Sequence, residues 1–240
     1  MPKFSKGITK RPLLIGISGK PGVGKSTLAS FAPSCCFVDT EGGTPYLNVE
    51  RISDINNYEE LKSTLKAFLT KPELQHVKTV IIDSLDASEL FINDETAKQN
   101  GKKNISLIGY NKGYELALNL WFELFSIINE LRDAGKNVIL ICHEQIKKIE
   151  SPIYGSYDTI SIRLNNKVVS YIHAMVDGLF YLANEMLISA DTQKPKLRKN
   201  KIIYTTERPD ILAKNRFNLP SEIIINGDDD YIKFFEMIQK

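Results

Sequence analysis

The sequence predicts an α/β fold with a central, mostly parallel, twisted sheet flanked by helices. Four short apolar runs have the pattern of strands buried on both faces: residues 13–18, 35–39, 79–83 and 137–142. Segments with helical periodicity separate these runs, which favours parallel pairing through right-handed crossovers. A glycine-rich loop follows the first run directly and leads into a helix. These three observations place the chain in the α/β class.

The helices between these strands are expected from their end signals. The first begins near Lys25 and ends before Pro33. Asn57, with Glu60 three residues later, resembles a capping box, and the apolar positions that follow share one helical face up to Pro72. Further helices are expected over residues 85–98, 114–134 and 230–239.

The other segments divide into irregular stretches and a hairpin. Residues 99–113 and 146–166 show little periodicity, and we expect long loops there. Residues 177–183 and 201–206 look like strands joined across a basic tip. The sequence therefore predicts a C-terminal antiparallel hairpin extension of the sheet.

Length and composition are those of one globular domain. The 240 residues are 42% hydrophobic and 25% charged, and the net charge is +2. We expect a single domain over residues 13–240, preceded by a basic arm over residues 1–12 that contains no acid. No apolar run reaches the roughly 18 residues of a membrane span, so no membrane partner is expected. The arm lacks the apolar stretch of a secretory signal, which favours a cytoplasmic location, the host cytoplasm if the chain is phage-encoded.

The strongest motif is GKPGVGKST, which has the P-loop spacing Gly-x-x-x-x-Gly-Lys-Ser. Its glycines let backbone N–H groups approach phosphate oxygens, and the following helix N-terminus favours an anion. Lys25 would reach the terminal phosphates and the Ser26 hydroxyl would ligate Mg²⁺. ATP and Mg²⁺ are therefore the expected cofactors. The expected nucleotide-binding residues are Gly19, Lys20, Pro21, Gly22, Val23, Gly24, Lys25, Ser26 and Thr27.

The same stretch differs by one residue from GKGGVGKST, the signature of MinD/ParA-like dimeric ATPases. In that family the first lysine contacts the partner's nucleotide, which would be the role of Lys20. Pro21 replaces the glycine beside that lysine and restricts the backbone there. We therefore interpret Lys20 as a loop cation.

Three carboxylates follow the second and third strands. Asp83 ends the apolar strand over 79–83, where it would join Ser26 in holding the magnesium shell, unless it only caps the next helix. Glu41, in VDTEGG, would orient and deprotonate the attacking water. The alternatives are that Glu41 is an exposed loop acid or that Asp39 is the catalytic carboxylate.

The order of these motifs resembles the RecA-core ATPases. VDTEGG is similar to their catalytic-glutamate strand, VIIDSLD to their magnesium strand and ICHEQIKK to the strand that senses the γ-phosphate. The resemblance implies that His143 or Gln145 is the sensor. AKNRF is similar to the element that reaches a neighbouring subunit's nucleotide, which implies a role in trans for Lys214 and Arg216. In size and motif order the chain resembles short phage-encoded RecA-core ATPases linked to single-strand annealing and recombination.

This resemblance also implies the partners. Such proteins act as homo-oligomers, rings or filaments, and hold single-stranded DNA on the loops after the third and fourth strands. Here these loops are the two irregular stretches, whose cations and tyrosines suit phosphates and bases, although ordinary surface loops would show the same residues. A single-strand-binding or annealing protein is a further possible partner. The expected DNA-binding residues are Lys102, Lys103, Lys147, Lys148 and Arg163, interleaved with Tyr110, Tyr154 and Tyr157.

Three functions remain in competition. The first is a Mg²⁺-dependent, DNA-dependent ATP hydrolase that supports phage recombination or annealing. The second is a MinD/ParA-like switch, which would need an aspartate-rich segment after the second strand that VDTEGG does not supply. The third is a phosphotransferase or regulatory nucleotide-binding module without DNA, for which arginines near the phosphates are sparse. The basic loops and AKNRF favour the first.

Overall fold

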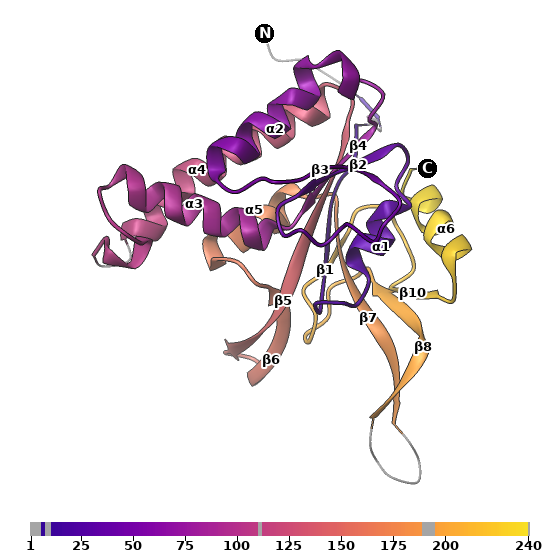
Figure 1. Cartoon of the computed structure of the whole chain (residues 1–240). Helices are drawn as coiled ribbons and strands as arrows, with labels where there is room; N and C mark the ends of the chain where they lie inside the picture. Colours follow the sequence, from indigo (N-terminus) through magenta and orange to yellow (C-terminus); the bar gives the residue numbers. More distant parts are fainter. Residues whose placement is uncertain (1–5, 8–10, 110–111, 189–194, 240) are drawn as a thin grey trace.

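The computed structural model describes residues 6–7, 11–109, 112–188 and 195–239 (Figure 1). Their main sheet has the strand order β10-β8-β7-β1-β5-β4-β2-β3. The six strands from β7 to β3 are parallel, whereas β8 and β10 are antiparallel at one edge. The predicted fold class, a mostly parallel sheet with a C-terminal antiparallel hairpin, is therefore confirmed.

The strands in this sheet are β1 (Leu14–Gly19), β2 (Cys35–Asp39), β3 (Glu50–Ile52), β4 (Thr79–Asp83), β5 (Asn137–Ser151), β7 (Gly178–Ile188), β8 (Pro195–Tyr204) and β10 (Glu222–Ile225), with β6 (Gly155–Ile162) on β5 and β9 (Lys214–Asn215) on β7. The helices are α1 (Lys25–Ser30), α2 (Tyr58–Thr70), α3 (Leu85–Gln99), α4 (Lys112–Asp133), α5 (Asn166–Met175) and α6 (Asp228–Gln239). Two short 3₁₀ turns, Pro72–Leu74 and Ile105–Leu107, lie between them.

The sheet separates two hydrophobic layers. Along β4, Val80 and Ile82 enter one core, which α2, α3, α4 and α5 cover, and Ile81 enters the other, which α1 and α6 cover (Figure 1). This alternation follows from the period of two in an extended chain. Both faces are buried, so the strands are continuous apolar runs, as the sequence predicts.

The helix signals are largely correct. The Asn57 side chain accepts a hydrogen bond from the Glu60 N–H at 3.0 Å, which is the N-cap half of the predicted capping box. The Glu60 carboxylate returns to the N–H of Asn56 at 2.7 Å rather than to that of Asn57. The box is therefore offset by one residue, although the helix begins where the sequence predicts.

The prediction of an irregular loop over 146–166 is wrong. β5 continues to Ser151 and pairs with β6 in an antiparallel hairpin, with register from Glu144↔Ile162 to Ser151↔Gly155. The extension carries polar residues, and Ile146 is 73% exposed, so neither face gives a buried period-two pattern. The helix α5 and the short strands β3 and β10 are also absent from the sequence prediction. By contrast, residues 100–109, the described part of the other predicted irregular stretch between α3 and α4, are irregular as predicted, apart from one 3₁₀ turn.

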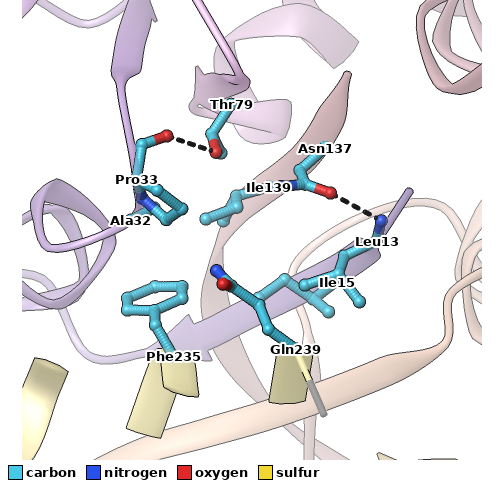
Figure 2. A pocket seen from close by; sticks show the side chains of 9 residues that line it. All are labelled: Leu13, Ile15, Ala32, Pro33, Thr79, Asn137, Ile139, Phe235 and Gln239. Carbon is cyan, nitrogen blue, oxygen red and sulfur yellow. Dashed lines mark hydrogen bonds between the residues drawn. The ribbon is translucent and has the colours of Figure 1, made fainter. Parts of the chain in front are cut away.

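A small cavity lies near the N-terminal ends of β1, β4 and β5. Its volume is about 10 Å³. Phe235 and Gln239 of α6 line one side of it (Figure 2). Asn137 and Thr79 also line it: Asn137 Oδ1 accepts the Leu13 N–H at 2.8 Å, and the Thr79 hydroxyl donates to the Pro33 carbonyl at 2.9 Å. Such a space holds about one water molecule at most.

Among the residues that the structure describes, no helix is both long and apolar enough to cross a membrane.

Candidate nucleotide site

The P-loop backbone depends on its glycines. Gly22 and Gly24 have φ angles of 74° and 102°, in the region that favours glycine. Gly19 lies so close to β7 that a Cβ would collide with the Leu182 carbonyl oxygen. The loop is therefore anchored on β7 and turned to present its N–H groups at the start of α1.

Lys25 is buried, and its ammonium folds back over the loop. It donates to the carbonyls of Gly19 and Lys20, each at 3.0 Å. Burial lowers the pKa of Lys25, and the nearby carboxylate of Asp83 offsets part of this shift. The Lys20 side chain is exposed, while its carbonyl helps to hold Lys25. Phosphate oxygens arriving at the loop would meet a cation that is already positioned.

Ser26 and Asp83 meet as the sequence predicts for a magnesium pair. The Ser26 hydroxyl donates to the Asp83 carboxylate at 2.6 Å. Burial raises the pKa of Asp83 to about 6, against the lowering effect of that hydrogen bond. Asp83 is not the cap of the next helix. Ser84 caps α3, because its hydroxyl accepts the Ala87 N–H. A hydroxyl and a carboxylate are hard oxygen donors, so these residues fit Mg²⁺.

Asp39 is saturated with hydrogen bonds and builds the loop that carries Glu41. One of its oxygens accepts the N–H groups of Glu41, Gly42 and Gly43, and the other accepts the N–H and hydroxyl of Thr44. Although burial raises the pKa of Asp39, these donors outweigh it and hold the pKa below its usual value. A carboxylate with its lone pairs so engaged has no acceptor left for a water molecule. The geometry therefore favours Glu41 over Asp39 as the base.

Glu41 lies at the mouth of the same cavity as the P-loop. Its carboxylate accepts a hydrogen bond from the Ser84 hydroxyl, and its side chain is 33% exposed. The cavity has a volume of about 380 Å³ and opens to solvent. It is lined by Pro21, Gly22, Gly24, Lys25, Ser26, Thr27, Glu41, Gly43, Tyr46, Leu47, Asp83 and His143.

Of the two candidate sensors, only His143 lies in this cavity. Its Nδ1 is 3.7 Å from the Glu41 carboxylate and 3.3 Å from that of Asp86. The backbone N–H of His143 donates to Asp86 at 2.8 Å, which holds β5 against the first turn of α3. Gln145 instead donates to the Ile162 carbonyl at 2.8 Å, within the β5–β6 hairpin.

Asp86 is a site residue that the sequence prediction lacks. It is buried, and it also accepts the guanidinium of Arg163 at 2.9 Å. Arg163, expected to bind DNA, thus joins the base of the hairpin to the nucleotide cavity through Asp86 and His143. The only sequence signal for Asp86 is its spacing of three residues from Asp83, in the first turn of α3. Tyr46, whose ring is fully exposed at the cavity, is also missing from the prediction.

Lys214 and Arg216 are not near the nucleotide cavity of their own chain. β9 pairs with β7 at Gly178, which lies beside the start of β1, whereas the P-loop follows its end. Lys214 donates to the Ala174 carbonyl at 3.0 Å, and Arg216 is 3.4 Å from Asp177. Only a neighbouring subunit could bring these cations to a nucleotide, so their role in trans stays a prediction.

The expected DNA-binding cations fall into separate groups. Lys147 and Lys148 lie on the β5–β6 hairpin, whose tip exposes 80% of Tyr154. Lys102 and Lys103 are exposed between α3 and α4, apart from that hairpin (Figure 1). Tyr110 and the acid-free arm, apart from residues 6–7 and 11–12, lie outside the described residues.

Comparisons with known proteins identify the family. A family model described as an AAA domain matches residues 11–217. The chain belongs to this family. Together with the P-loop geometry, membership makes it an AAA-type P-loop ATPase domain with a mostly parallel sheet.

One solved structure gives a distant match to this chain. The crystal structure of the flagellar accessory protein FlaH from Methanocaldococcus jannaschii is similar at 13% identity and a TM-score of 0.44. The match covers 89% of this chain and 84% of that one. No curated protein matches the chain. The fold assignment of this AAA domain therefore depends on its own strand order and P-loop.

Proposed function

We propose that this AAA domain hydrolyses ATP with Mg²⁺ and acts as an oligomer on single-stranded DNA in recombination or annealing. The observation that supports hydrolysis most directly is the Ser26–Asp83 pair beside Lys25, with Glu41 at the same cavity. A nucleotide-binding module without catalysis would not need a partly free carboxylate at this position.

The chemistry follows from where these groups lie. The P-loop N–H groups and Lys25 bind the phosphates, and Ser26 and Asp83 would hold Mg²⁺, which would supply charge neutralisation when bound. Glu41 orients a water molecule and accepts its proton while the water oxygen bonds to the γ-phosphorus. The bond from that phosphorus to the β–γ bridging oxygen breaks, and ADP and phosphate leave. His143 lies beside Glu41, where it would register the departure of the γ-phosphate.

A physical connection from this site to DNA supports the second half of the proposal. Asp86 contacts both His143 and Arg163, and Arg163 ends the hairpin that carries Lys147 and Lys148. A change at the γ-phosphate would therefore reach the hairpin through three side chains in contact. Exposed cations beside exposed aromatic rings suit a single strand, because the cations neutralise phosphates while rings stack on bases.

The first experiment measures ATP hydrolysis with and without single-stranded DNA, with Lys25→Ala as the blank. We expect hydrolysis that DNA stimulates and that Lys25→Ala abolishes. No hydrolysis under either condition, together with no DNA retention at low salt, would contradict the proposal. Hydrolysis that ignores DNA would instead favour the regulatory module without DNA.

A second experiment locates the DNA surface. The double variant Lys147→Ala/Lys148→Ala should weaken DNA retention. The slope of log affinity against log salt concentration should also become less steep by about 0.7 for each phosphate that the chain no longer neutralises. Lys66→Ala/Lys71→Ala, which removes two exposed charges from α2 and its C-terminal end, is the matched control. Equal weakening by both would show that only net charge matters. The same assay on Lys102→Ala/Lys103→Ala tests the α3–α4 connection.

Oligomeric action has its own test. Lys214 and Arg216 would complete a neighbour's site, so mixing Arg216→Ala subunits with Lys25→Ala subunits should restore part of the activity. No restoration, from subunits shown by light scattering to assemble together, would remove these residues from the mechanism.

A further inference from the structure

Lys201 is a cation of the C-terminal hairpin that reaches the P-loop of its own chain. It lies on β8 two residues before Ile203, a fully buried residue that shares its core with Leu28 of α1. Because side chains alternate along a strand, Lys201 and Ile203 point to the same face, where α1 begins. A Cβ added to Gly24 would collide with the ammonium nitrogen of Lys201. The amine therefore lies directly against the loop.

The surroundings of Lys201 leave its charge uncompensated. The side chain is half-buried, and burial lowers the pKa of the ammonium. Among the described residues, no carboxylate offsets that effect, whereas Asp83 does so for Lys25. A cation moved out of water without a counter-charge is destabilised, and an anion that arrives beside it removes the penalty. Lys201 thus has the environment of a phosphate-binding group.

The sheet order indicates which phosphates it faces. Glu41 follows β2, Asp83 ends β4 and His143 lies on β5, and these three strands are on one side of β1. β7 and β8, with Lys201, lie on the other side. The γ-phosphate and Mg²⁺ belong at the first side, where the base and the Ser26–Asp83 pair are. The second side therefore faces the part of the triphosphate nearer the nucleoside.

We propose that Lys201 binds the α- and β-phosphates of the nucleotide in cis, as a second lysine at the P-loop. This inference rests on the proposed ATP binding and deepens it. The predicted roles of Lys214 and Arg216 need a partner subunit, whereas Lys201 acts within one chain. A cation at this place strengthens the binding of ADP and of ATP to the same extent, because both nucleotides carry these two phosphates.

The test is the affinity of Lys201→Met for Mg·ADP and Mg·ATP, measured by isothermal titration calorimetry. We expect both affinities to fall by about tenfold, because the variant cannot form the charge-assisted hydrogen bond to either nucleotide. Lys199→Met is the matched control, because Lys199 is exposed, lies two residues earlier on the same strand and carries the same charge. Lys201→Arg should recover much of the affinity, which a merely misfolded strand would not.

Each outcome is decisive. Unchanged affinity in Lys201→Met, or an equal loss in Lys199→Met, would overturn the role of Lys201 and leave ATP binding intact. Weakened ATP binding with unchanged ADP binding would overturn the assignment to the α- and β-phosphates. A wild-type chain that binds neither nucleotide would overturn the proposed function itself.

Discussion

Asp39 and Asp83 are neighbours in the sheet with opposite environments. They face each other in register at the ends of β2 and β4, and both are almost fully buried. Asp39 accepts five hydrogen bonds from the loop that follows it. Asp83 accepts one from a side chain, that of Ser26. Two identical residue types at equivalent positions are therefore built for different tasks.

The pKa values record this difference. Both carboxylates lose water on burial, but donors hold the pKa of Asp39 below its usual value whereas the pKa of Asp83 rises to about 6. A saturated carboxylate stabilises the fold, and an under-satisfied one costs stability until a cation arrives. Asp39 therefore organises the loop at the site, whereas Asp83 is free to bind a cation there.

The largest expected effect comes from Glu41, on the loop that Asp39 organises. Glu41→Gln removes the proton acceptor while the P-loop stays intact, so kcat for ATP hydrolysis should fall by about 10²–10⁴-fold with ADP affinity nearly unchanged. Steady-state kinetics and calorimetry measure the two quantities. Glu73→Gln, at an exposed 3₁₀ turn, is the control. Full activity in Glu41→Gln would mean that another group is the base.

Asp83→Asn should separate function from stability. The amide cannot supply the charged ligand, so Mg²⁺-dependent hydrolysis should be lost. Because ionised Asp83 is destabilised by burial, the same change should raise the free energy of unfolding without nucleotide by about 1–3 kcal/mol at pH 7.5. Urea unfolding measures this gain. A less stable Asp83→Asn would refute the contrast with Asp39.

Asp39→Asn should do the reverse. Its amide group would direct N–H donors at the N–H groups of the loop, so the free energy of unfolding should fall by about 2 kcal/mol. Thr44→Val, which removes one of the five donors, should cost about 1 kcal/mol. Urea unfolding of the two variants tests whether the cost follows the number of hydrogen bonds removed. Equal free energies of unfolding for Asp39→Asn and wild type would show that the five hydrogen bonds to Asp39 do not stabilise the fold.

The sequence predicts the nucleotide end of this molecule well because its signals are local. GKPGVGKST and the strand that ends in Asp83 each contain their own pattern, and the sheet then brings them together. The sequence leaves the roles of Asp39 and Glu41 open, because they depend on which carboxylate the loop's N–H groups face, and no sequence pattern records that.

What the sequence prediction lacks depends on contacts between distant segments. Asp86 belongs to the site because it accepts hydrogen bonds from His143 and Arg163, which follow it by 57 and 77 residues. The sequence prediction places Lys201 only at the start of the strand over 201–206, because its approach to Gly24 needs the β7–β8 hairpin to fold back beside α1. The β5–β6 hairpin is not predicted, because both its faces are partly exposed. Its sequence therefore lacks the alternation of apolar and polar residues on which strand prediction depends.

The smallest expected effect is a pH dependence that distinguishes Asp83 from Asp39. The pKa of Asp83 is raised in the folded chain, so the folded state binds the proton more tightly than the unfolded state, and acidification from pH 7.5 to 5.0 should stabilise wild type relative to Asp83→Asn by about 1 kcal/mol. The pKa of Asp39 is lowered, so its contribution is present above the unfolded pKa and is lost only as the pH falls through the lower folded value. The two windows therefore do not overlap. Urea unfolding of wild type and Asp83→Asn at both pH values measures the difference in the free energy of unfolding. A difference that widens on acidification would mean that the charge of Lys25 outweighs burial and lowers the pKa of Asp83.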